Sequence, residues 1–407
     1  MRHLRAIGLS PNLEFADVGV ALKAILRPWL YRVAPAEQKL HATLCSYFSS
    51  QNVWLFNSGR SALLIYLKSL QLPHNSVVAV QAFTCNAVIN PIRWAGFLPN
   101  YIDIDPATYT MSPTDLQKKL TPKTKVLIIQ HTFGQTADLA KLLDIARSHN
   151  LIIIEDCAHA LGGKRNNQLL GTFGDAAIYS FGRDKVISSV YGGCLLVNKA
   201  SQVGALQQQY DEVDYPTRFW IFQQLLHPII TYVALQTWYW FGFGRALFAL
   251  AQRGHILSLA VSRGERQGIQ PHYFPRRLPG GLAYLVQHQL AKLDRLNAQR
   301  RLIAKIYQQI FNPDIPLAES IYLRYTVRAK NRDKIFLELK KQDVILGDWY
   351  WQVVVPAAAD LATHNYPLGS CPQAELAAQE VINLPTHIQI NQKCAEMIAR
   401  TVQSLRA

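Results

Sequence analysis

Between residues 53 and 200, short apolar runs alternate with stretches whose apolar residues recur at helical spacing. The runs Val77–Val80, Lys125–Ile129 and Leu151–Ile154 have the continuous apolar character of parallel strands that are buried on both faces. Leu139–Ser148, which lies between two of them, has the pattern of an amphipathic helix. The alternation predicts a large, doubly wound α/β domain with a mainly parallel sheet.

The segments on either side of this region have a different pattern. Residues 13–48 are expected to form amphipathic helices that lead into the large domain, and a long helix is expected from Leu293 to Tyr307. A smaller α+β unit follows, with an apolar run at Ile321–Tyr325 and a helix patterned in Lys and Glu. We therefore predict an N-terminal helical segment (1–52), the large domain (53–200), an insertion (201–276) and a small C-terminal α+β domain (277–407).

The predicted insertion is apolar and basic. Residues 219–244 contain no Asp, Glu, Lys or Arg. We expect Pro228 to break or kink a helix here and to leave 229–241 uninterrupted. A helix over 229–241 would be only about 20 Å long, whereas the hydrocarbon core of a bilayer is about 30 Å thick. Two interpretations stay open for 219–251: an element lying in a membrane interface, or helices packed on protein. The aromatic residues of the run are Phe219, Trp220, Phe222, Tyr232, Trp238, Tyr239, Trp240, Phe241 and Phe243, and the basic residues around it are Arg218, Arg245, Arg253 and Arg263.

Two residues carry candidate chemistry. Asp156 ends the apolar run 151–154, and Lys185 closes the sequence Ser180-Phe-Gly-Arg-Asp-Lys. A lysine can hold a cofactor aldehyde covalently, and an aspartate at the carboxyl end of a strand can pair with a pyridinium nitrogen. Open α/β sheets bind ligands at that edge. Either residue alone is common on surfaces and in turns, but the ordered pair predicts a pyridoxal phosphate site.

Further motifs in order along the chain resemble the DegT/DnrJ/EryC1/StrS family of pyridoxal phosphate enzymes, which are mostly sugar aminotransferases. The resemblance covers most of the chain and implies fold type I, with a large doubly wound domain and a small C-terminal domain. The motifs are Asn57–Leu63, Ala82–Thr84, Ala95-Gly96, Asp103–Asp105, His131–Gln135, Glu155–Ala160, Gly171–Asp175, Ser180–Lys185, Gln289–Asp294 and Asn383–His387.

The resemblance also implies roles for single residues. Lys185 would hold the cofactor and later shuttle a proton, and Asp156 would bind the ring nitrogen. Ser180 and the backbone N–H groups of Gly59, Arg60 and Ser61, at a helix start, would hold the phosphate. His159 would lie near the 3′ oxygen of the cofactor.

Three departures from the family pattern concern substrate and cofactor contacts. Cys85 stands where the family places a stacking aromatic ring, and Arg60 replaces a phosphate-loop threonine, so its guanidinium could bind phosphate or project into solvent. Arg277 keeps its place in a stretch whose cross-subunit Asn is lost. We expect Arg277 and His387 to act in substrate binding or across a subunit boundary, and we expect no metal.

Composition adds limits on setting and partners. The chain of 407 residues has a net charge of +15 and a pI near 9.5, which favours phosphorylated substrates, anionic membrane surfaces or nucleic acid. No nucleic-acid motif is present, so we expect no such partner. Six cysteines without a C-x-x-C pair, and no secretory leader pattern, lead us to expect the cytoplasm, with room for attachment to the inner face of the membrane.

The leading hypothesis is a homodimeric aminotransferase with a shared active site. It would convert a keto-sugar, linked to a nucleotide or a lipid, to an amino sugar with an amino acid donor, in polysaccharide or glycolipid biosynthesis. Transamination is favoured because Lys185 is present, whereas relatives that dehydrate sugars tend to carry histidine there. The alternatives are a pyridoxal phosphate enzyme acting on an amino acid or another amine, and a membrane-associated binding or regulatory protein with little turnover.

Overall fold

The computed structural model describes residues 4–33, 35–238, 241–254, 256–314, 317–357 and 361–406. Within these residues the central sheet has seven strands in the order β2-β11-β10-β7-β6-β3-β5. Strand β11 is antiparallel to its neighbours β10 and β2, and the other neighbouring strands pair in parallel. The predicted mainly parallel α/β sheet is therefore confirmed. The strands are β2 (Val53–Phe56), β3 (Val77–Gln81), β5 (Leu98–Ile102), β6 (Thr124–Gln130), β7 (Ile152–Asp156), β10 (Ala176–Ser180) and β11 (Gly193–Val197).

Alternate residues of the central strands enter two different cores, because successive side chains of a strand point to opposite faces. Leu127, Ile129 and Ile153 belong to one core, whereas Ile128 and Ile154 belong to the other. Helices cover both faces, which explains why these strands are apolar at every position. The first core includes residues of α2 (Pro35–Phe48), α5 (Pro113–Lys119), α6 (Leu139–Ser148) and α11 (Gly280–Leu290), and the second includes α3 (Gly59–Ser69), α4 (Asn86–Trp94) and α7 (Val203–Asp211).

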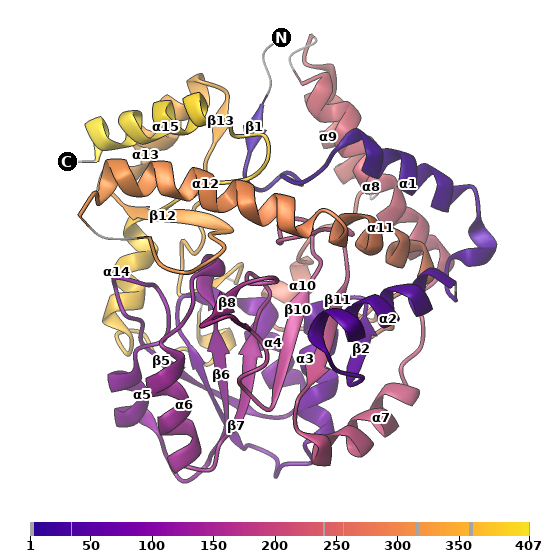
Figure 1. Cartoon of the computed structure of the whole chain (residues 1–407), viewed down its shortest axis with the longest axis vertical. Coiled ribbons are helices and arrows are strands. Elements are labelled where there is room, and N and C mark those ends of the chain that lie inside the picture. The colour runs from indigo at the N-terminus through magenta and orange to yellow at the C-terminus, as the bar shows by residue number, and fades with distance from the viewer. Residues whose placement is uncertain are drawn as a thin grey trace.

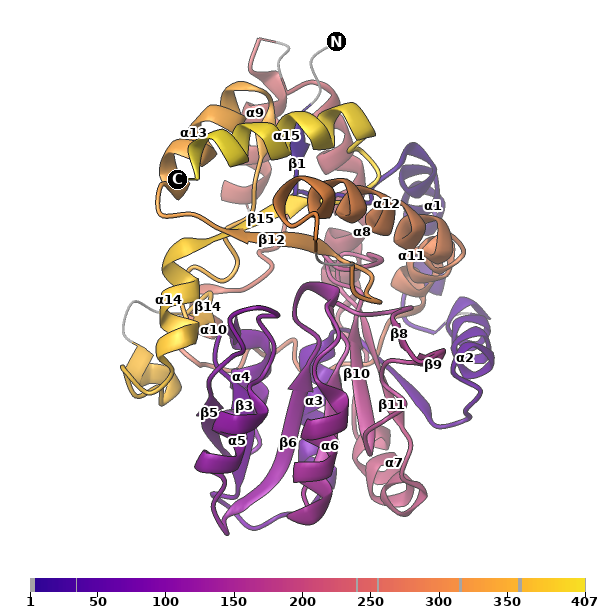
Figure 2. The same ribbon diagram turned by 60° about the vertical axis from the view of Figure 1, so that its left-hand side comes forward.

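The C-terminal part of the chain forms a third core above the sheet, as both views show (Figures 1 and 2). Its strands β12 and β15 pair antiparallel, and β1, near the start of the chain, joins it by pairing with β13. The elements around this core are β1 (Arg5–Ala6), α12 (Leu293–Phe311), β12 (Arg324–Arg328), α13 (Arg332–Lys341), β13 (Val344–Ile345), β15 (Val381–Pro385) and α15 (Gln392–Leu405). Two further elements of the C-terminal part, β14 (Val354–Val355) and α14 (Pro372–Glu380), pack into the second core instead.

The apolar insertion forms helices α8 (Arg218–Gln236), α9 (Phe243–Arg253) and α10 (Arg263–Arg266). The expected break at Pro228 is absent, because α8 runs through this residue, and the helix ends at Gln236 and not at residue 241. Proline removes one backbone hydrogen bond from a helix, and the burial of Trp220, Ile221 and Leu225 on the same helix offsets that loss. Residues 239 and 240 of the aromatic run lie outside the described residues.

Helix α8 packs against α1 (Phe15–Ile25), α9 and α11 of its own chain. Figure 1 shows α1, α8 and α9 together beside the small domain. No helix in the described part of the chain is both long and apolar enough to span a bilayer.

Candidate active site

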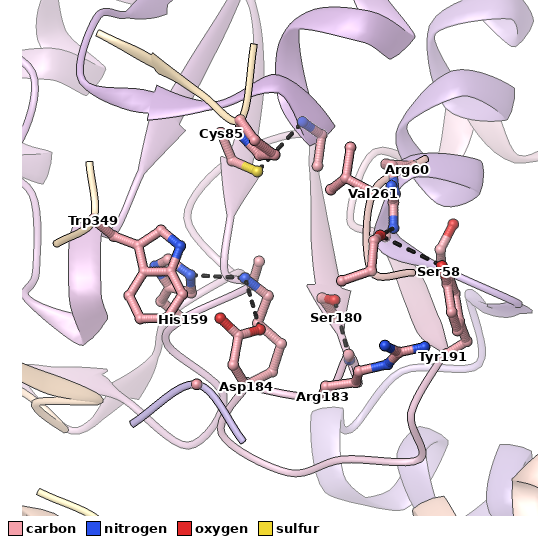
Figure 3. A pocket seen from close by; sticks show the side chains of 18 of the residues that line it. Ser58, Arg60, Cys85, His159, Ser180, Arg183, Asp184, Tyr191, Val261 and Trp349 are labelled. Carbon is pink, nitrogen blue, oxygen red and sulfur yellow. Dashed lines mark hydrogen bonds and ion pairs between the residues drawn. The ribbon is translucent and has the colours of Figure 1, made fainter. Parts of the chain in front are cut away.

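A cavity of about 360 Å³ opens where the sheet, the small domain and the insertion meet (Figure 3). The sheet and its loops contribute Asp156, His159, Ser180 and Lys185, as the sequence predicted for this edge. The small domain adds Arg324, Trp349 and Tyr350, and the insertion adds His227, Thr231, Phe248 and Gln252. The cavity therefore draws on three parts of the chain.

Lys185 lies in the loop that follows β10. Its Nζ is 2.8 Å from Nε2 of His159 and 4.0 Å from the carboxylate of Asp184. The side chain of Asn12 donates a hydrogen bond of 2.8 Å to the backbone carbonyl of Lys185 and so fixes the loop from the far end of the sequence. The amine is thus held at the cavity beside the ring of His159.

His159 is a buried, neutral ring. Burial, together with the charges of Lys185 and Arg324, lowers the pKa of His159 well below its ordinary value. The backbone N–H of Phe133 donates to Nδ1 at 3.3 Å. Nε2 faces the amine of Lys185 at 2.8 Å, and Phe133 stacks on the ring at a centroid distance of 5.9 Å.

Asp156 ends β7 and its carboxylate accepts one hydrogen bond, from the backbone N–H of Ala158 at 3.0 Å. Burial raises the pKa of Asp156, while that N–H and the charge of Lys185 act in the opposite direction. A buried carboxylate with spare acceptor capacity is suited to pair with a cationic N–H, which is what a protonated pyridine nitrogen presents.

The neighbouring Glu155 points to the other side of the strand and organises the loop before β10. Its carboxylate accepts the backbone N–H groups of Gly171, Phe173 and Gly174 at 2.7–2.8 Å, and His131 lies 3.2 Å away. The side chains of His131, Glu155 and Cys157 lie close enough together to hold a metal ion. The carboxylate of Glu155, however, already accepts these hydrogen bonds.

The start of α3 forms one end of the cavity. Ser58 caps the helix by accepting the N–H of Ser61 at 3.0 Å, and the N–H groups of Gly59 and Arg60 ahead of it have no acceptor within the helix. The Ser61 hydroxyl turns inward to Asn57 at 2.6 Å and does not line the cavity. Gly193 allows the close approach of β11, because a Cβ there would lie 2.5 Å from the backbone nitrogen of Gly59.

Arg60 neither projects into solvent nor is free to bind an anion. It forms an ion pair with the fully buried Glu265 of the insertion, and its Nη2 donates to the carbonyl of Ala260 at 3.0 Å. The guanidinium lies 4.6 Å from the ring centroid of Phe274. The backbone of Arg60 thus lines the helix start, while its charge is neutralised by a residue 205 positions later.

Cys85, which also lines the cavity, caps α4. Its Sγ accepts the backbone N–H of Ala87 at 3.4 Å, and burial raises the pKa of the thiol. The side chain therefore offers an uncharged packing surface at the position where we noted a missing aromatic ring.

The structure places two predicted site residues away from this cavity. Arg277 donates to the carbonyls of Val213 and Tyr210 at 2.7 and 3.0 Å and lies over the Tyr210 ring. His387 follows β15 in the small domain, and burial lowers its pKa to about 3. Neither residue lines the cavity in this chain, and a role across a subunit boundary stays a prediction.

Several cavity residues were not identified from the sequence. Arg324 of β12 is buried, donates to Asp184 at 2.7 Å and lies 3.7 Å from a ring centroid of Trp349. Although burial alone would raise it, the charges of Lys185 and Arg324 hold the pKa of Asp184 well below its usual range. These residues come together only through the packing of the small domain on the sheet, and their local sequence carries no signal of it.

A model of the DegT/DnrJ/EryC1/StrS aminotransferase family matches residues 16–208 and 274–403. The chain belongs to this family. The match leaves out residues 209–273, which include α8, α9 and α10.

Similar proteins cover nearly all of the chain. A pleiotropic regulatory protein of Geobacillus stearothermophilus is 23% identical over 397 residues, 94% of this chain and 92% of its own length. The GDP-perosamine synthase of Caulobacter vibrioides is 24% identical over 388 residues, 93% of this chain and 92% of its own. The solved structure of the putative sugar aminotransferase Spr1654 from Streptococcus pneumoniae in its PLP-form has a TM-score of 0.72 and 21% identity, covering 99% and 98% of the two chains.

Proposed function

We propose that this protein is a pyridoxal phosphate-dependent aminotransferase that replaces the keto group of an activated sugar with an amino group. The observation that carries the proposal is the convergence of Lys185, His159 and Asp156 in one cavity beside the start of α3. The names of two similar proteins, a GDP-perosamine synthase and a sugar aminotransferase in a PLP-form, support the substrate class and the cofactor.

The residues present fit this cofactor. The backbone N–H groups of Gly59 and Arg60, with the hydroxyl of Ser180, would take the phosphate, and Asp156 the ring nitrogen. Lys185 presents its amine beside His159, where the aldehyde could bond to it. Bound there, pyridoxal phosphate supplies an electron sink for the bond that is broken at the substrate carbon.

The chain's own groups would handle protons and water. Nζ of Lys185 would remove the proton from the α-carbon of the amino acid donor and, in the second half of the reaction, return one to the former keto carbon. Nε2 of His159 would form a hydrogen bond with the polar atom beside it and so orient that atom. Trp349 and Tyr350 from the small domain close the opposite wall and reduce the access of water.

A labelling experiment tests the proposal. The protein is incubated with ketones linked to nucleotides or to lipids and with ¹⁵N-amino glutamate or ¹⁵N-amide glutamine, and the sugar product is analysed by mass spectrometry. We expect ¹⁵N in an amino sugar with wild-type protein and none with Lys185→Ala. Transfer of the label only to a keto acid or simple amine acceptor would favour the alternative amino acid or amine enzyme. A protein that binds no pyridoxal phosphate would overturn the proposal and favour the regulatory alternative.

We also propose that the enzyme is a homodimer with a shared active site to which Arg277 contributes. In support, Arg277 lies beside the outer edge of the sheet, where it bridges to Phe56 of the edge strand β2, and its side chain is 24% exposed. Lys185→Ala and Arg277→Ala chains are each expected to be inactive, and their heterodimer to regain part of the activity. Verified heterodimers without activity would place Arg277 outside the shared site.

Finally, we propose that this enzyme works at the inner face of the cytoplasmic membrane. Six large apolar side chains are exposed on α1, on the turn after it and on α8, and we call this surface the α1–α8 face. The ring of Phe15 lies 5.8 Å from that of Tyr232 and so joins the two helices. Exposed basic residues beside an apolar surface are typical of an interfacial element. The face consists of Phe15, Leu22, Leu26, Trp29, Phe219 and Val233, and the exposed basic residues are Lys23, Arg27, Arg32 and Arg218.

A further inference from the structure

A second guanidinium lines the cavity, and its environment differs from that of Arg60. Arg183 donates from Nη2 to the hydroxyl of Ser258 at 2.6 Å and lies 5.6 Å from the ring centroid of Tyr191. Its Nε is buried, with no hydrogen-bond partner in the described part of the chain. Among the described residues, the carboxylate nearest in sequence, Asp184, is paired with Arg324 instead. The charge of Arg183 is therefore not neutralised by an ion pair within the described chain.

The insertion holds Arg183 at the cavity wall. Ser258 accepts from Arg183 and donates to Gln224 of α8 at 2.6 Å, and the Gln224 amide donates to the carbonyl of Trp220. The hydroxyl of Tyr191 donates to the carbonyl of Leu259 at 2.6 Å. These bonds fix the guanidinium before any ligand arrives, so little side-chain entropy is lost on binding.

Arg183 lies among groups that line the helix start and the insertion side of the cavity. Figure 3 shows it on the same side of the cavity as Ser58, Arg60 and Ser180. His227 of α8 also lines the cavity, and burial, together with the charge of Arg183, lowers the pKa of His227 well below its ordinary value. A buried cation with an unpaired N–H is unfavourable alone and strongly favoured beside an anion.

We propose that Arg183 is the phosphoryl-binding arginine of this cavity, held in place by the insertion. Its Nε and Nη atoms present the fork that matches two oxygens of a phosphate, a role that Arg60 cannot fill while paired with Glu265. The inference rests on the proposed function. The phosphoryl group has two sources there, the phosphate ester of the cofactor and the diphosphate of a nucleotide-linked sugar.

The test compares ligands that differ only in the phosphate. Dissociation constants of pyridoxal 5′-phosphate and of pyridoxal are measured by tryptophan fluorescence for wild type, Arg183→Gln, Arg183→Lys and Ser258→Ala. If Arg183 binds the phosphate of the cofactor, Arg183→Gln weakens the binding of pyridoxal 5′-phosphate about ten- to hundredfold and leaves the binding of pyridoxal unchanged. Arg183→Lys keeps part of the affinity for pyridoxal 5′-phosphate. Ser258→Ala leaves the charge of Arg183 in place and therefore loses less of this affinity than Arg183→Gln.

A second experiment tests whether Arg183 binds the diphosphate of a nucleotide-linked sugar. With the cofactor loaded, binding of UDP and of inorganic pyrophosphate is followed by calorimetry. A loss of this binding in Arg183→Gln, with cofactor affinity unchanged, assigns Arg183 to the sugar diphosphate. Unchanged affinity for all phosphoryl probes, in variants that melt like wild type, overturns the inference.

Two further outcomes remain distinct. If Arg183→Gln does not fold, the same comparison with Arg183→Lys decides, because that variant lacks the fork but keeps the charge. A wild-type protein that binds no pyridoxal 5′-phosphate contradicts the proposed function itself, whereas cofactor binding that is indifferent to Arg183 contradicts only this inference.

Discussion

The ion pair between Arg60 and Glu265 joins the cofactor loop to the insertion, and Arg60→Met should expose its contribution to stability. The side chains of Arg60 and Glu265 are only 11% and 0% exposed. Methionine keeps the apolar contact with Phe274 but leaves the carboxylate of Glu265 without its cation. Two weaker donors remain, the N–H of Ser262 at 3.0 Å and the hydroxyl of Tyr273 at 3.3 Å.

Removing one partner of a buried ion pair costs about 3–5 kcal/mol of the free energy of unfolding, and the two remaining donors place this case near 3 kcal/mol. An unfolding entropy of about 2.1 cal/mol/K per residue gives about 0.85 kcal/mol/K for the whole chain, so Tm should fall by about 3–4 °C.

Calorimetry on the protein without cofactor measures this change. Glu265→Gln alone leaves the arginine unpaired, and the double variant Arg60→Met/Glu265→Gln removes both charges. The double variant should be more stable than the sum of the two single effects predicts. Additive effects, or an Arg60→Met protein as stable as wild type, would refute the reasoning. A selective loss of pyridoxal 5′-phosphate affinity without loss of stability would show that Arg60 binds the phosphate after all.

Three other predictions concern the electron sink, acid stability and the α1–α8 face. Asp156→Asn should keep the fold but slow the single-turnover half-reaction with glutamate, because a neutral amide no longer favours the protonated ring nitrogen; an unchanged rate would eliminate this assignment. The pKa of His387 is lowered to about 3, below its unfolded value of about 6.5, so the unfolded chain binds the extra proton and stability falls as pH drops below 6.5. Between pH 7 and pH 5 this residue alone should lower the free energy of unfolding by about 2 kcal/mol, and His387→Gln should lessen that loss by the same amount in urea titrations. Identical pH profiles of wild type and variant would contradict this prediction. Trp29→Ser/Phe219→Ser should reduce binding to anionic vesicles in flotation assays, whereas Leu337→Ser, at another exposed apolar side chain, on α13, should not. Wild-type protein that ignores such vesicles at low salt would leave the α1–α8 face as a protein-packing surface.

The sequence alone determined the framework of the large domain and placed the centre of the predicted site at one edge of its sheet. Helix Leu139–Ser148 forms with the bounds that its periodicity predicts, and the runs beginning at Val77, Lys125 and Leu151 become β3, β6 and β7 with ends shifted by one or two residues. These features follow from local patterns, because periodic burial and chain turns act over a few residues. Asp156 ends β7 and Lys185 follows β10, so both line one cavity at this edge, and their roles toward a cofactor stay predictions.

Tertiary structure decided what surrounds that centre. Arg60 meets Glu265 across 205 positions, and Arg324 meets Asp184 across 140. Pro228 lies inside α8 because packing of the helix offsets one missing hydrogen bond, a balance that the local sequence does not contain. Arg183 has no acidic partner among the described residues for the same kind of reason, because the carboxylate beside it in sequence pairs with Arg324 on another part of the chain. Charge pairing depends on distances in space, and only the packing of the insertion and the small domain on the sheet sets those distances.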